Sequence, residues 1–505
     1  MMRLAPWLAA LQSAGFAAQI IGDAETLVTG VSIDTRTISP GAIYVALRGE
    51  RFDGHDFAAD AGRRGAAALL VERALSLPMP QLVVSDTRRA LGAIAAHWRD
   101  RFAVPLIAVV GSNGKTTTTQ MIASILAHAY GERDGRPAWF ATRGNRNNEV
   151  GVPLMLLELD SVHRAVVLEL GMNHPGEIDV LCRWARPTVT LVTNAQREHQ
   201  EFLDSVEATA RENGAAIAGL PAGGTAVFPG DDACAPVWRE LAAERPTIEF
   251  AIARDADEMA AAARSRGLRV QIAARVCAAA HGSLLEVASP WGEITAELAT
   301  VGKHNARNAL AAAAAGLAIG IAPAAIERGL SAFRPVAGRG VVLAGRNGAT
   351  LIDDSYNANP DSVRAAIELL AGQPGGAPRG AARRAAQSPA RILILGDMGE
   401  TGARGVEFHR EVGAYARARG VDHLLALGEL AREAVTAFGE GGAHFGAVED
   451  LNAAAIALTG DHRTFLVKGS RFMHMERVVA ALRRPDARPN GRSDAPLSVE
   501  SDPHA

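Results

Sequence analysis

Short apolar runs alternate with polar segments along most of this chain, and their lengths are typical of buried strands. In the middle of the chain, runs at 105–110, 165–170 and 189–193 are separated by segments whose apolar residues have helical spacing. Strand, helix and strand in that order predict a parallel sheet with helices on both faces. Similar runs at 42–47, 67–71 and 81–84 predict a smaller α/β unit before this sheet.

A third α/β unit is predicted from about Ala332 onward. Its expected strands are 350–353, 391–395, 423–427 and 464–467. Before it, residues 223–301 predict only irregular short strands, including 268–272 and 282–287, and an alanine-rich helix follows over 305–320. The predicted protein is therefore α/β with three domains, at 1–100, 101–331 and 332–484. Segments 372–390 and 485–505 are rich in Pro, Gly, Ser or Asp and are expected to be disordered.

The composition narrows the class of protein. A net charge of −3 gives no broad basic surface, which makes a polynucleotide or an anionic lipid surface an improbable partner. The three cysteines, Cys182, Cys234 and Cys277, are widely spaced, so they indicate neither a disulfide framework nor a zinc cluster. No apolar stretch reaches the roughly 18 residues of a membrane span. These features together predict a cytoplasmic protein.

The first residues are apolar like a short signal peptide, but their pattern differs from one. Leu4, Trp7, Leu8 and Leu11 fall at helical spacing, and Gln12 and Ser13 then interrupt the apolar run. We therefore predict a helix that docks on the first domain.

The stretch Gly-Ser-Asn-Gly-Lys-Thr-Thr-Thr-Thr at 111–119 directly follows the apolar run 105–110. Glycines allow a tight turn in which successive N–H groups converge, and a helix N-terminus beyond adds partial positive charge, so the pattern predicts a phosphate site. Lys115 suits the outer phosphates of a nucleotide, and the Thr116 hydroxyl suits the accompanying magnesium. A plain strand-to-helix turn with a solvated Lys115 is the alternative. Val109 stands where the longer phosphate-loop pattern has its first glycine.

Lysine is rare in this chain. Of its 52 basic residues only Lys115, Lys303 and Lys468 are lysines, and the others are arginines. These three lysines are therefore candidates for sites that need a compact ammonium group and not a planar guanidinium.

Polar clusters follow several of the predicted strands, where open α/β sheets bind their ligands. Glu169 follows one strand next to the phosphate loop and His199 follows another, so both could complete metal coordination, although a helix cap and a surface histidine are equally simple readings. Asparagines at 145, 147 and 148 suit a peptide or sugar ligand, or merely turns. Asn305 and Asn308 could face a purine. In the third unit, segments 353–360, 396–400 and 468–471 suggest one shared cleft, or ordinary turns.

These residues resemble those of the Mur ligases, the ATP-dependent amide-forming enzymes of peptidoglycan assembly. The resemblance spans roughly residues 28–480 and rests on segments 31–36, 47–49, 52–57, 144–153, 169–177 and 353–360. Within the family it is strongest to the member that joins D-alanyl-D-alanine to a UDP-N-acetylmuramoyl-tripeptide. The Asp-Asn-Pro-Arg signature of the ligase that adds the third peptide residue is absent from the sequence.

The resemblance assigns residues to each ligand. ATP would be bound by Gly111, Ser112, Asn113, Gly114, Lys115, Thr116, Thr117, Asn305, Asn308, Arg339 and Asp354, and Mg²⁺ by Thr116, Glu169 and His199. The UDP-sugar would be held by Ser32, Asp34, Arg36, Asp53 and His55, the muramoyl peptide by Asn145, Asn147 and Asn148, and the dipeptide by Lys468, Ser470 and Arg471.

One departure from the family concerns the metal site. Mur ligases generally carry a carbamylated lysine in a helix shortly after the metal-site histidine, but here that helix contains Arg211, Glu212 and Asn213, and no lysine lies between Lys115 and Lys303. Our hypothesis is that the Glu212 carboxylate supplies the negative charge directly.

In the implied reaction, ATP converts the tripeptide carboxylate into an acyl phosphate. The amine of the dipeptide then attacks this acyl phosphate. His409 and Asp354 are both candidates for the general base. The alternatives are a Mur ligase adding a single amino acid, a folylpolyglutamate-synthetase-like ligase, and a nucleotide switch, which would need an Asn-Lys-x-Asp signature that three lysines in known places do not provide. A monomer is expected.

Overall fold

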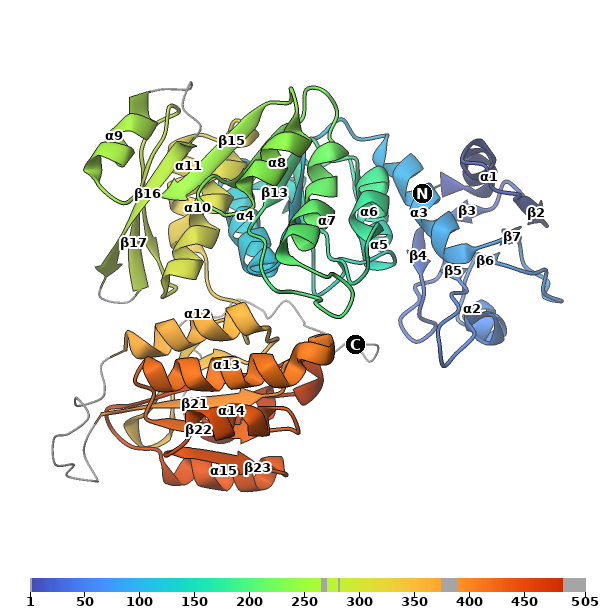
Figure 1. The fold of residues 1–505 in the computed structure, drawn as a ribbon. Coiled ribbons are helices and arrows are strands. Elements are labelled where there is room, and N and C mark those ends of the chain that lie inside the picture. Colours follow the sequence, from blue (N-terminus) through green and yellow to red (C-terminus); the bar gives the residue numbers. More distant parts are fainter. Residues whose placement is uncertain (1, 265–269, 280–281, 374–388, 485–505) are drawn as a thin grey trace.

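The structure is a computed structural model that describes residues 2–264, 270–279, 282–373 and 389–484. Figure 1 shows three α/β domains in chain order: the N-terminal domain in blue, the central domain from cyan to yellow and the C-terminal domain in orange. Each has its own main sheet. The predicted three-domain α/β fold is confirmed. Most of the segment expected to be disordered at 372–390, and all of 485–505, lie outside the described residues.

The N-terminal domain is built on a five-stranded sheet in the order β2-β7-β6-β5-β4, in which only β2 is antiparallel to its neighbour. Its strands are β2 (Gln19–Ile21), β4 (Gly30–Ser32), β5 (Ala42–Val45), β6 (Ala68–Val71) and β7 (Gln81–Val83), beside the pair β1 (Met2–Arg3) and β3 (Leu27–Val28). Its helices are α1 (Leu4–Ser13), α2 (Ala58–Arg63) and α3 (Thr87–Arg99). The docking helix is confirmed, since Leu4, Trp7 and Leu11 of α1 are buried.

The central domain has a nine-stranded sheet in the order β11-β12-β8-β13-β14-β15-β16-β17-β18. Its strands are β8 (Leu106–Val110), β11 (Trp139–Ala141), β12 (Ala165–Glu169), β13 (Val189–Val192), β14 (Thr225–Pro229), β15 (Thr247–Ile252), β16 (Val270–Ala279), β17 (Gly282–Ala288) and β18 (Ile294–Leu298). A small separate hairpin joins β9 (Glu132–Arg133) to β10 (Arg136–Pro137).

Helices cover both faces of the central sheet, as the continuous apolar strands require. One face packs against α4 (Lys115–Tyr130), α10 (Lys303–Ala318) and α11 (Pro323–Ala332). The other packs against α5 (Gly151–Leu157), α6 (Glu177–Ala185), α7 (Val206–Ala218) and α8 (Ala235–Ala242). Helix α9 (Ala256–Arg264) lies beside β16. The alanines of α10 are small enough for the helix to be buried on most of its circumference.

The strand expected at 282–287 is confirmed as β17, but the strands over 223–301 are regular members of the main sheet and are not irregular. Strands β14 and β15 continue the parallel part of the main sheet, and β16, β17 and β18 extend it as an antiparallel meander. β17 and β18 alternate buried and more exposed residues because only one face of this extension is covered. Part of the strand expected at 268–272 lies outside the described residues, and β16 begins at Val270.

The C-terminal domain has a six-stranded sheet in the order β19-β20-β24-β21-β22-β23, with only β19 antiparallel. Its strands are β19 (Val341–Ala344), β20 (Thr350–Asp354), β21 (Ala390–Gly396), β22 (His423–Leu427), β23 (Gly442–Phe445) and β24 (Arg463–Lys468). Helices α12 (Pro360–Ala371), α13 (Gly405–Ala418) and α14 (Ala431–Phe438) cover one face, and α15 (Val448–Ala457) and α16 (Glu476–Leu482) the other.

The arrangement brings strand ends of two domains together. β8 lies between β12 and β13, so the loops after these three strands share one edge of the central sheet. The start of α12 in the C-terminal domain meets that edge, because Asn359 Nδ2 donates to Asn113 Oδ1 at 2.9 Å. No helix within the described ranges is long and apolar enough to cross a membrane.

Candidate active site

The phosphate loop connects β8 to α4, as the sequence predicted. Gly111 has a φ of +124°, and a Cβ there would lie 2.2 Å from Thr193 Oγ1, so only glycine fits this turn. The loop is also held from outside: the Gly111 N–H donates to Asn213 Oδ1 at 2.8 Å, and the Asn113 N–H donates to Asn194 Oδ1 at 3.0 Å. The backbone turn that would receive phosphate is therefore preformed.

Lys115, the first residue of α4, folds back over this turn. Its ammonium donates to Gly111 O at 2.5 Å and Ser112 O at 3.2 Å, and it forms an ion pair with Glu198 Oε1 at 3.0 Å. The lysine and glutamate side chains are only 13% and 14% exposed. A carboxylate thus lies beside the Lys115 ammonium, the group for which the sequence predicted an outer phosphate.

The Thr116 hydroxyl and the Glu169 carboxylate form the best candidate for a metal site. Thr116 Oγ1 donates to Glu169 Oε2 at 2.7 Å, and Asn147 Nδ2 donates to Glu169 Oε1 at 2.8 Å. No group of three or more His, Cys, Asp or Glu side chains suited to a metal occurs in the described part of the chain. Magnesium at nucleotide sites takes one or two protein oxygens and fills its octahedron with water and phosphate, so this pair fits Mg²⁺.

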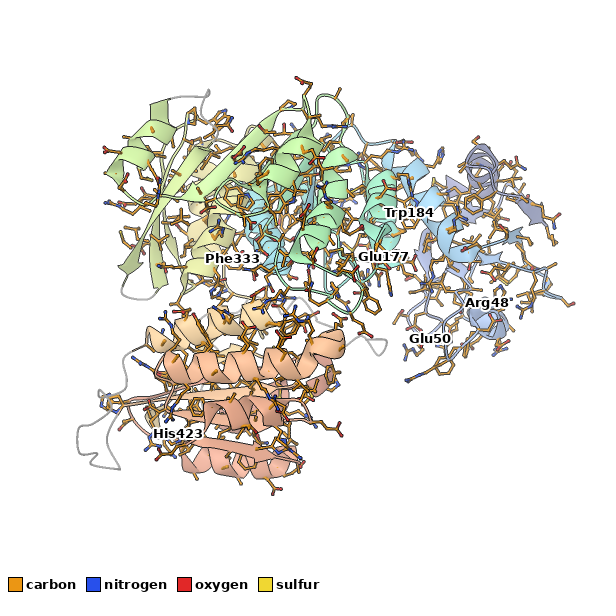
Figure 2. All side chains as sticks on the ribbon, in the orientation of Figure 1. Arg48, Glu50, Glu177, Trp184, Phe333 and His423 are labelled. Atoms are coloured by element: carbon orange, nitrogen blue, oxygen red, sulfur yellow. The ribbon has the colours of Figure 1, made fainter. Side chains whose placement is uncertain are left out.

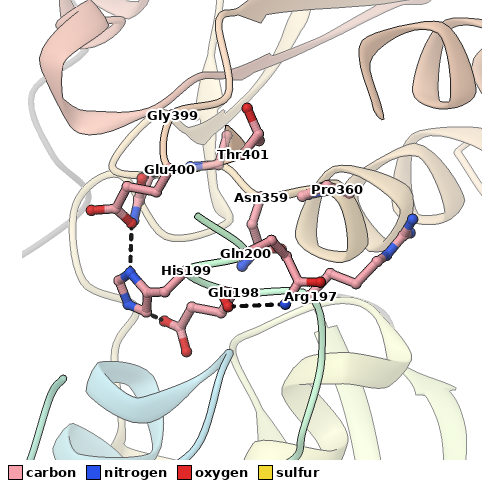
Figure 3. Close-up of a pocket in the computed structure, with 11 residues that line it drawn as sticks. Arg197, Glu198, His199, Gln200, Asn359, Pro360, Gly399, Glu400 and Thr401 are labelled. Carbon is pink, nitrogen blue, oxygen red and sulfur yellow. Dashed lines mark hydrogen bonds and ion pairs between the residues drawn. The ribbon is translucent and has the colours of Figure 1, made fainter. Parts of the chain in front are cut away.

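His199 does not join this pair in the structure. Its Nδ1 lies 2.8 Å from Glu400 Oε2 of the C-terminal domain and its Nε2 lies 3.5 Å from Glu198 Oε1, as Figure 3 shows. Burial lowers the pKa of His199, but hydrogen bonds to Glu198 and Glu400 outweigh it and raise this pKa to about 9. In this arrangement the His199 ring contacts two carboxylates, and its role as a metal ligand stays a prediction.

Glu212 also lies apart from the Thr116–Glu169 pair. Its two carboxylate oxygens accept hydrogen bonds from the Gly176 and Ile178 N–H groups at 2.9 and 3.1 Å. A carboxylate at a helix N-terminus satisfies free N–H groups and the helix dipole. In the structure Glu212 caps α6, and its metal role stays a hypothesis.

The asparagines of α10 lie beside the phosphate loop. A Cβ on Gly114 would be 2.3 Å from Asn308 Oδ1, and the Asn305 Nδ2 donates to Val301 O at 3.0 Å. Both side chains and that of Thr117 are buried. Lys303 begins the same helix and is exposed.

The C-terminal domain brings most of its predicted residues into one cluster. Lys468, only 4% exposed, donates to Asp354 Oδ2 at 2.7 Å and Asn357 O at 2.9 Å. Ser470 Oγ donates to Ala358 O at 3.0 Å. Beside them, the guanidinium carbons of Arg339 and Arg471 lie 4.1 and 5.6 Å from the Tyr356 ring centre. The ends of β20 and β24 thus carry an acid–base pair, and two further cations lie beside it, Arg339 from the segment before β19 and Arg471 from the turn after β24.

His409 does not reach this cluster. It is fully buried in α13, where its Nδ1 bonds to Gly405 O at 2.7 Å and its Nε2 accepts the Met398 N–H at 3.0 Å. Burial lowers the pKa of His409. With both ring nitrogens bonded to the backbone, His409 cannot take a proton from a substrate, and only Asp354 remains of the two predicted bases.

The residues predicted to hold the UDP-sugar fall into two groups. Asp34 and Arg36 form an exposed ion pair at 2.7 Å, and Ser32 Oγ bonds to Asp34 O at 2.9 Å. The His55 side chain is instead fully buried: it bonds to Asp53 Oδ1 at 2.5 Å and accepts the Glu72 N–H at 2.8 Å. His55 therefore fixes the loop before α2 and does not face a ligand.

The three predicted peptide-binding asparagines differ in environment. Asn147 contacts Glu169, as described above. The Asn148 Oδ1 accepts the Val150 and Gly151 N–H groups and so caps α5, and Asn145 O accepts the Asn147 N–H at 2.7 Å. Only Asn147 is joined by its side chain to the candidate metal pair.

Sequence reasoning missed several residues of this site. Asn213 supports Gly111, Glu198 pairs with Lys115, Glu400 pairs with His199, and Arg197 contacts the C-terminal domain. The local signals were the run of polar residues after β13 and, for Glu400, the segment 396–400 that was already expected at a cleft. The partners come from distant parts of the chain, and no local pattern identifies them.

Comparison with known proteins gives matches in all three domains. Residues 27–99 match the Mur ligase family catalytic domain, residues 109–316 the Mur ligase middle domain, and residues 338–471 the Mur ligase glutamate ligase domain. The UDP-N-acetylmuramoyl-tripeptide--D-alanyl-D-alanine ligase of Escherichia coli (strain K12) is 36% identical over 91% of this chain and 94% of its own length. The Bacillus subtilis (strain 168) protein of the same name is 31% identical over 91% and 94%.

A solved structure agrees with these sequence matches. MurF from Acinetobacter baumannii superposes with a TM-score of 0.81 at 30% identity, covering 95% of this chain and 98% of that chain. The similarity therefore extends over the three domains and not only over the phosphate loop. The chain belongs to the Mur ligase family.

Proposed function

We propose that this protein is an ATP-dependent ligase that joins D-alanyl-D-alanine to UDP-N-acetylmuramoyl-tripeptide and so makes the pentapeptide precursor of peptidoglycan. Relatives named for this reaction match it over nine tenths of its length. The observation in the structure that carries the proposal is the contact between Asn113 and Asn359, because it sets the phosphate loop against the domain that bears the Asp354–Lys468 cluster. A nucleotide on one domain and the attacking amine on the other can therefore meet there.

The first step transfers a phosphoryl group. The tripeptide carboxylate oxygen attacks the γ-phosphorus of ATP, the bond from that phosphorus to the bridging oxygen breaks, and ADP leaves with the electron pair. Such a transfer depends mainly on alignment and charge placement. The first N–H groups of α4, which begins at Lys115, have no partner within the helix and can bind phosphate. Lys115 supplies a positive charge once it exchanges Glu198 for phosphate.

We also propose that Mg²⁺ takes part. Thr116 and Glu169 would hold it, and when bound it would neutralise phosphate charge. Asn147, which bonds the other oxygen of Glu169, orients the carboxylate.

In the second step the dipeptide amine attacks the acyl carbon, the bond from that carbon to the phosphate oxygen breaks, and inorganic phosphate leaves. The amine must lose a proton, and Asp354 is the carboxylate at the cleft that can accept it. Lys468 pairs with Asp354, and Ser470 and Arg471 contact the segment that follows it, so we propose that these three residues orient the dipeptide. Arg339 and the α10 asparagines would complete the nucleotide site.

The remaining assignments concern the first domain and the assembly. We propose that Ser32, Asp34 and Arg36 contact the UDP-sugar, with Asp53 and His55 stabilising their surroundings. One chain carries both sides of the cleft, so we propose that a monomer is active. Its use of ATP and a nucleotide sugar is consistent with the cytoplasm.

The test is ADP release by the purified full-length protein with ATP, Mg²⁺ and UDP-N-acetylmuramoyl-tripeptide. D-alanyl-D-alanine is expected to stimulate release, whereas D-alanine, D-glutamate or a diamino acid alone is not. Chelation of Mg²⁺ with EDTA should abolish the stimulated rate. Stimulation by a single amino acid but not by the dipeptide would overturn the proposal.

A further inference from the structure

We propose that Arg197 is a positioning residue for the ligation, and that it acts by fastening the C-terminal domain to the phosphate-loop edge of the central domain. This inference rests on the proposed function for its chemistry. Its structural basis is the set of contacts made by one guanidinium group.

Arg197 lies in the segment after β13 and bonds two carboxylates on two helices of the other domain. Its Nη2 and Nε donate to Asp361 Oδ1 at 2.6 and 3.1 Å, and its Nη1 donates to Glu411 Oε2 at 2.6 Å. Its backbone N–H also donates to Asp361 Oδ2, at 2.9 Å. The arginine side chain is 19% exposed and lies over the Phe408 ring, with its guanidinium carbon 5.2 Å from the ring centre.

The geometry distinguishes this contact from an ordinary surface ion pair. Surface pairs contribute little because both side chains stay solvated and mobile. Here the planar guanidinium of Arg197 donates to Asp361 on one side and to Glu411 on the other. Arg364 also donates to Glu411, at 2.9 Å, so two cations balance two carboxylates. The hydrogen bonds to Glu411 and Asp361 raise the pKa of Arg197. A lysine ammonium is a compact point charge and could not reproduce the several fixed hydrogen bonds that the planar guanidinium makes with both acids.

The position of Arg197 in the chain links it to the nucleotide site. The residues before it are bound to the phosphate loop, since the Gln196 N–H donates to Ser112 Oγ at 2.9 Å. The residue after it, Glu198, pairs with Lys115. In Figure 3, Arg197, Glu198 and His199 lie on one segment, facing Asn359, Pro360 and Glu400 of the C-terminal domain. Arg197 therefore joins the two domains at a point where both of its neighbours in the chain, Gln196 and Glu198, contact the phosphate loop.

The chemistry explains why this junction matters. The acyl phosphate forms at the central domain, and the amine that must attack it is held by the C-terminal domain. Water can attack the same carbon, which returns the tripeptide carboxylate and releases phosphate without forming an amide. Fixing the start of α12 against the phosphate loop keeps the amine near the acyl carbon and water out.

The variant Arg197→Met keeps the length and packing of the side chain and removes its charge. We expect one product per ADP in the wild type, and in Arg197→Met an ADP-to-product ratio that rises roughly twofold or more as the acyl phosphate is lost to water. The KM for the dipeptide should rise more than the Kd for ADP. Arg197→Lys should restore part of the coupling.

The matched control is Arg410→Met on α13, whose side chain pairs with Glu433 inside the C-terminal domain and is 60% exposed. It should leave the ratio at one. Glu411→Gln is a second variant that weakens the same contact from the other domain, and it should shift the ratio in the same direction as Arg197→Met.

Hydrogen exchange supplies a readout that needs no substrate. In Arg197→Met, peptides covering 194–200 and the start of α12 should exchange faster, while those covering β22 should not change. If the wild type makes no product, the proposed function fails and exchange alone decides the present inference. Unchanged exchange at α12, or an unchanged ratio and dipeptide KM in a folded Arg197→Met protein, would overturn it.

Discussion

At the scale of single residues, the nucleotide site is occupied by its own side chains. Glu198 neutralises the Lys115 ammonium, which also donates to two backbone carbonyl groups, so phosphate must displace a carboxylate to reach it. Competition of this kind lowers the affinity for nucleotide by the free energy of the contact that is lost. Glu198 is therefore predicted to set how tightly the empty enzyme takes up nucleotide.

Replacing Glu198 with glutamine should tighten ADP binding. The amide keeps the shape of the side chain but removes the charge that competes with phosphate, which is worth about 1 kcal/mol, or roughly fivefold in Kd, for a partly buried pair. Titration calorimetry with ADP in the presence of EDTA measures this without a metal contribution.

Glu201→Gln is the matched control, since Glu201 is exposed on the same segment. Its Kd for ADP should equal that of the wild type. An unchanged or weaker affinity in Glu198→Gln would show that the carboxylate does not compete with phosphate.

At the scale of secondary-structure elements, helices α3 and α6 join the N-terminal domain to the central one. A Cβ added at Gly92 of α3 would lie 2.2 Å from Trp184 Cε2 on α6. Figure 2 shows Trp184 on the side of the central domain that faces the N-terminal domain. The glycine thus allows two helices to approach closely and helps to fix the position of the N-terminal domain against the central one.

Gly92→Ala should destabilise the protein even though alanine favours a helix. The helix propensity gains about 1 kcal/mol, but the overlap with an indole ring between two packed helices costs about 1–3 kcal/mol and forces the helices apart. A lower Tm together with a higher KM for UDP-N-acetylmuramoyl-tripeptide is expected.

His97→Ala, at an exposed position of the same helix, serves as the comparison and should change neither quantity. A Gly92→Ala protein with raised Tm and unchanged KM would mean that α3 and α6 can separate without consequence.

The central strands of the main sheet could be predicted from the sequence, because buried parallel strands are continuous apolar runs. The runs at 105–110, 165–170 and 189–193 became β8, β12 and β13 almost residue for residue. Residues 223–301 were harder, since the exposed face of β17 and β18 mixes polar residues into the strands. The edge of a sheet gives a weaker pattern than its centre.

The candidate site was predictable where one segment carries the chemistry, as at Gly111–Thr117. It was not predictable where the partners are distant: Arg197 bonds residues 164 and 214 positions away. His409 was a candidate base and His55 a candidate ligand for the UDP-sugar, because a sequence shows a residue type but not the groups that bond to it. Burial with both nitrogens bonded made each a structural residue.

At the scale of the whole molecule, three domains each supply one part of a single reaction. The central domain would activate the carboxylate, the C-terminal domain would deliver the amine, and the N-terminal domain would anchor the nucleotide sugar. Within the described ranges, the central and C-terminal domains contact each other through the pairs Asn113–Asn359, Arg197–Asp361 and His199–Glu400. The arrangement accounts for a ligase in which the site is completed by domain contact.

The central claim is that this chain makes one particular amide bond, and the most direct measurement is the mass of its product. The protein is incubated with ATP, Mg²⁺, UDP-N-acetylmuramoyl-tripeptide and an equimolar mixture of D-alanyl-D-alanine, D-alanine and D-glutamate. The mass of the UDP-linked product is then measured by mass spectrometry. We predict a single new species whose mass equals tripeptide precursor plus dipeptide minus water. A species carrying only one added amino acid, or ADP formed with no heavier UDP-linked product, would contradict the account.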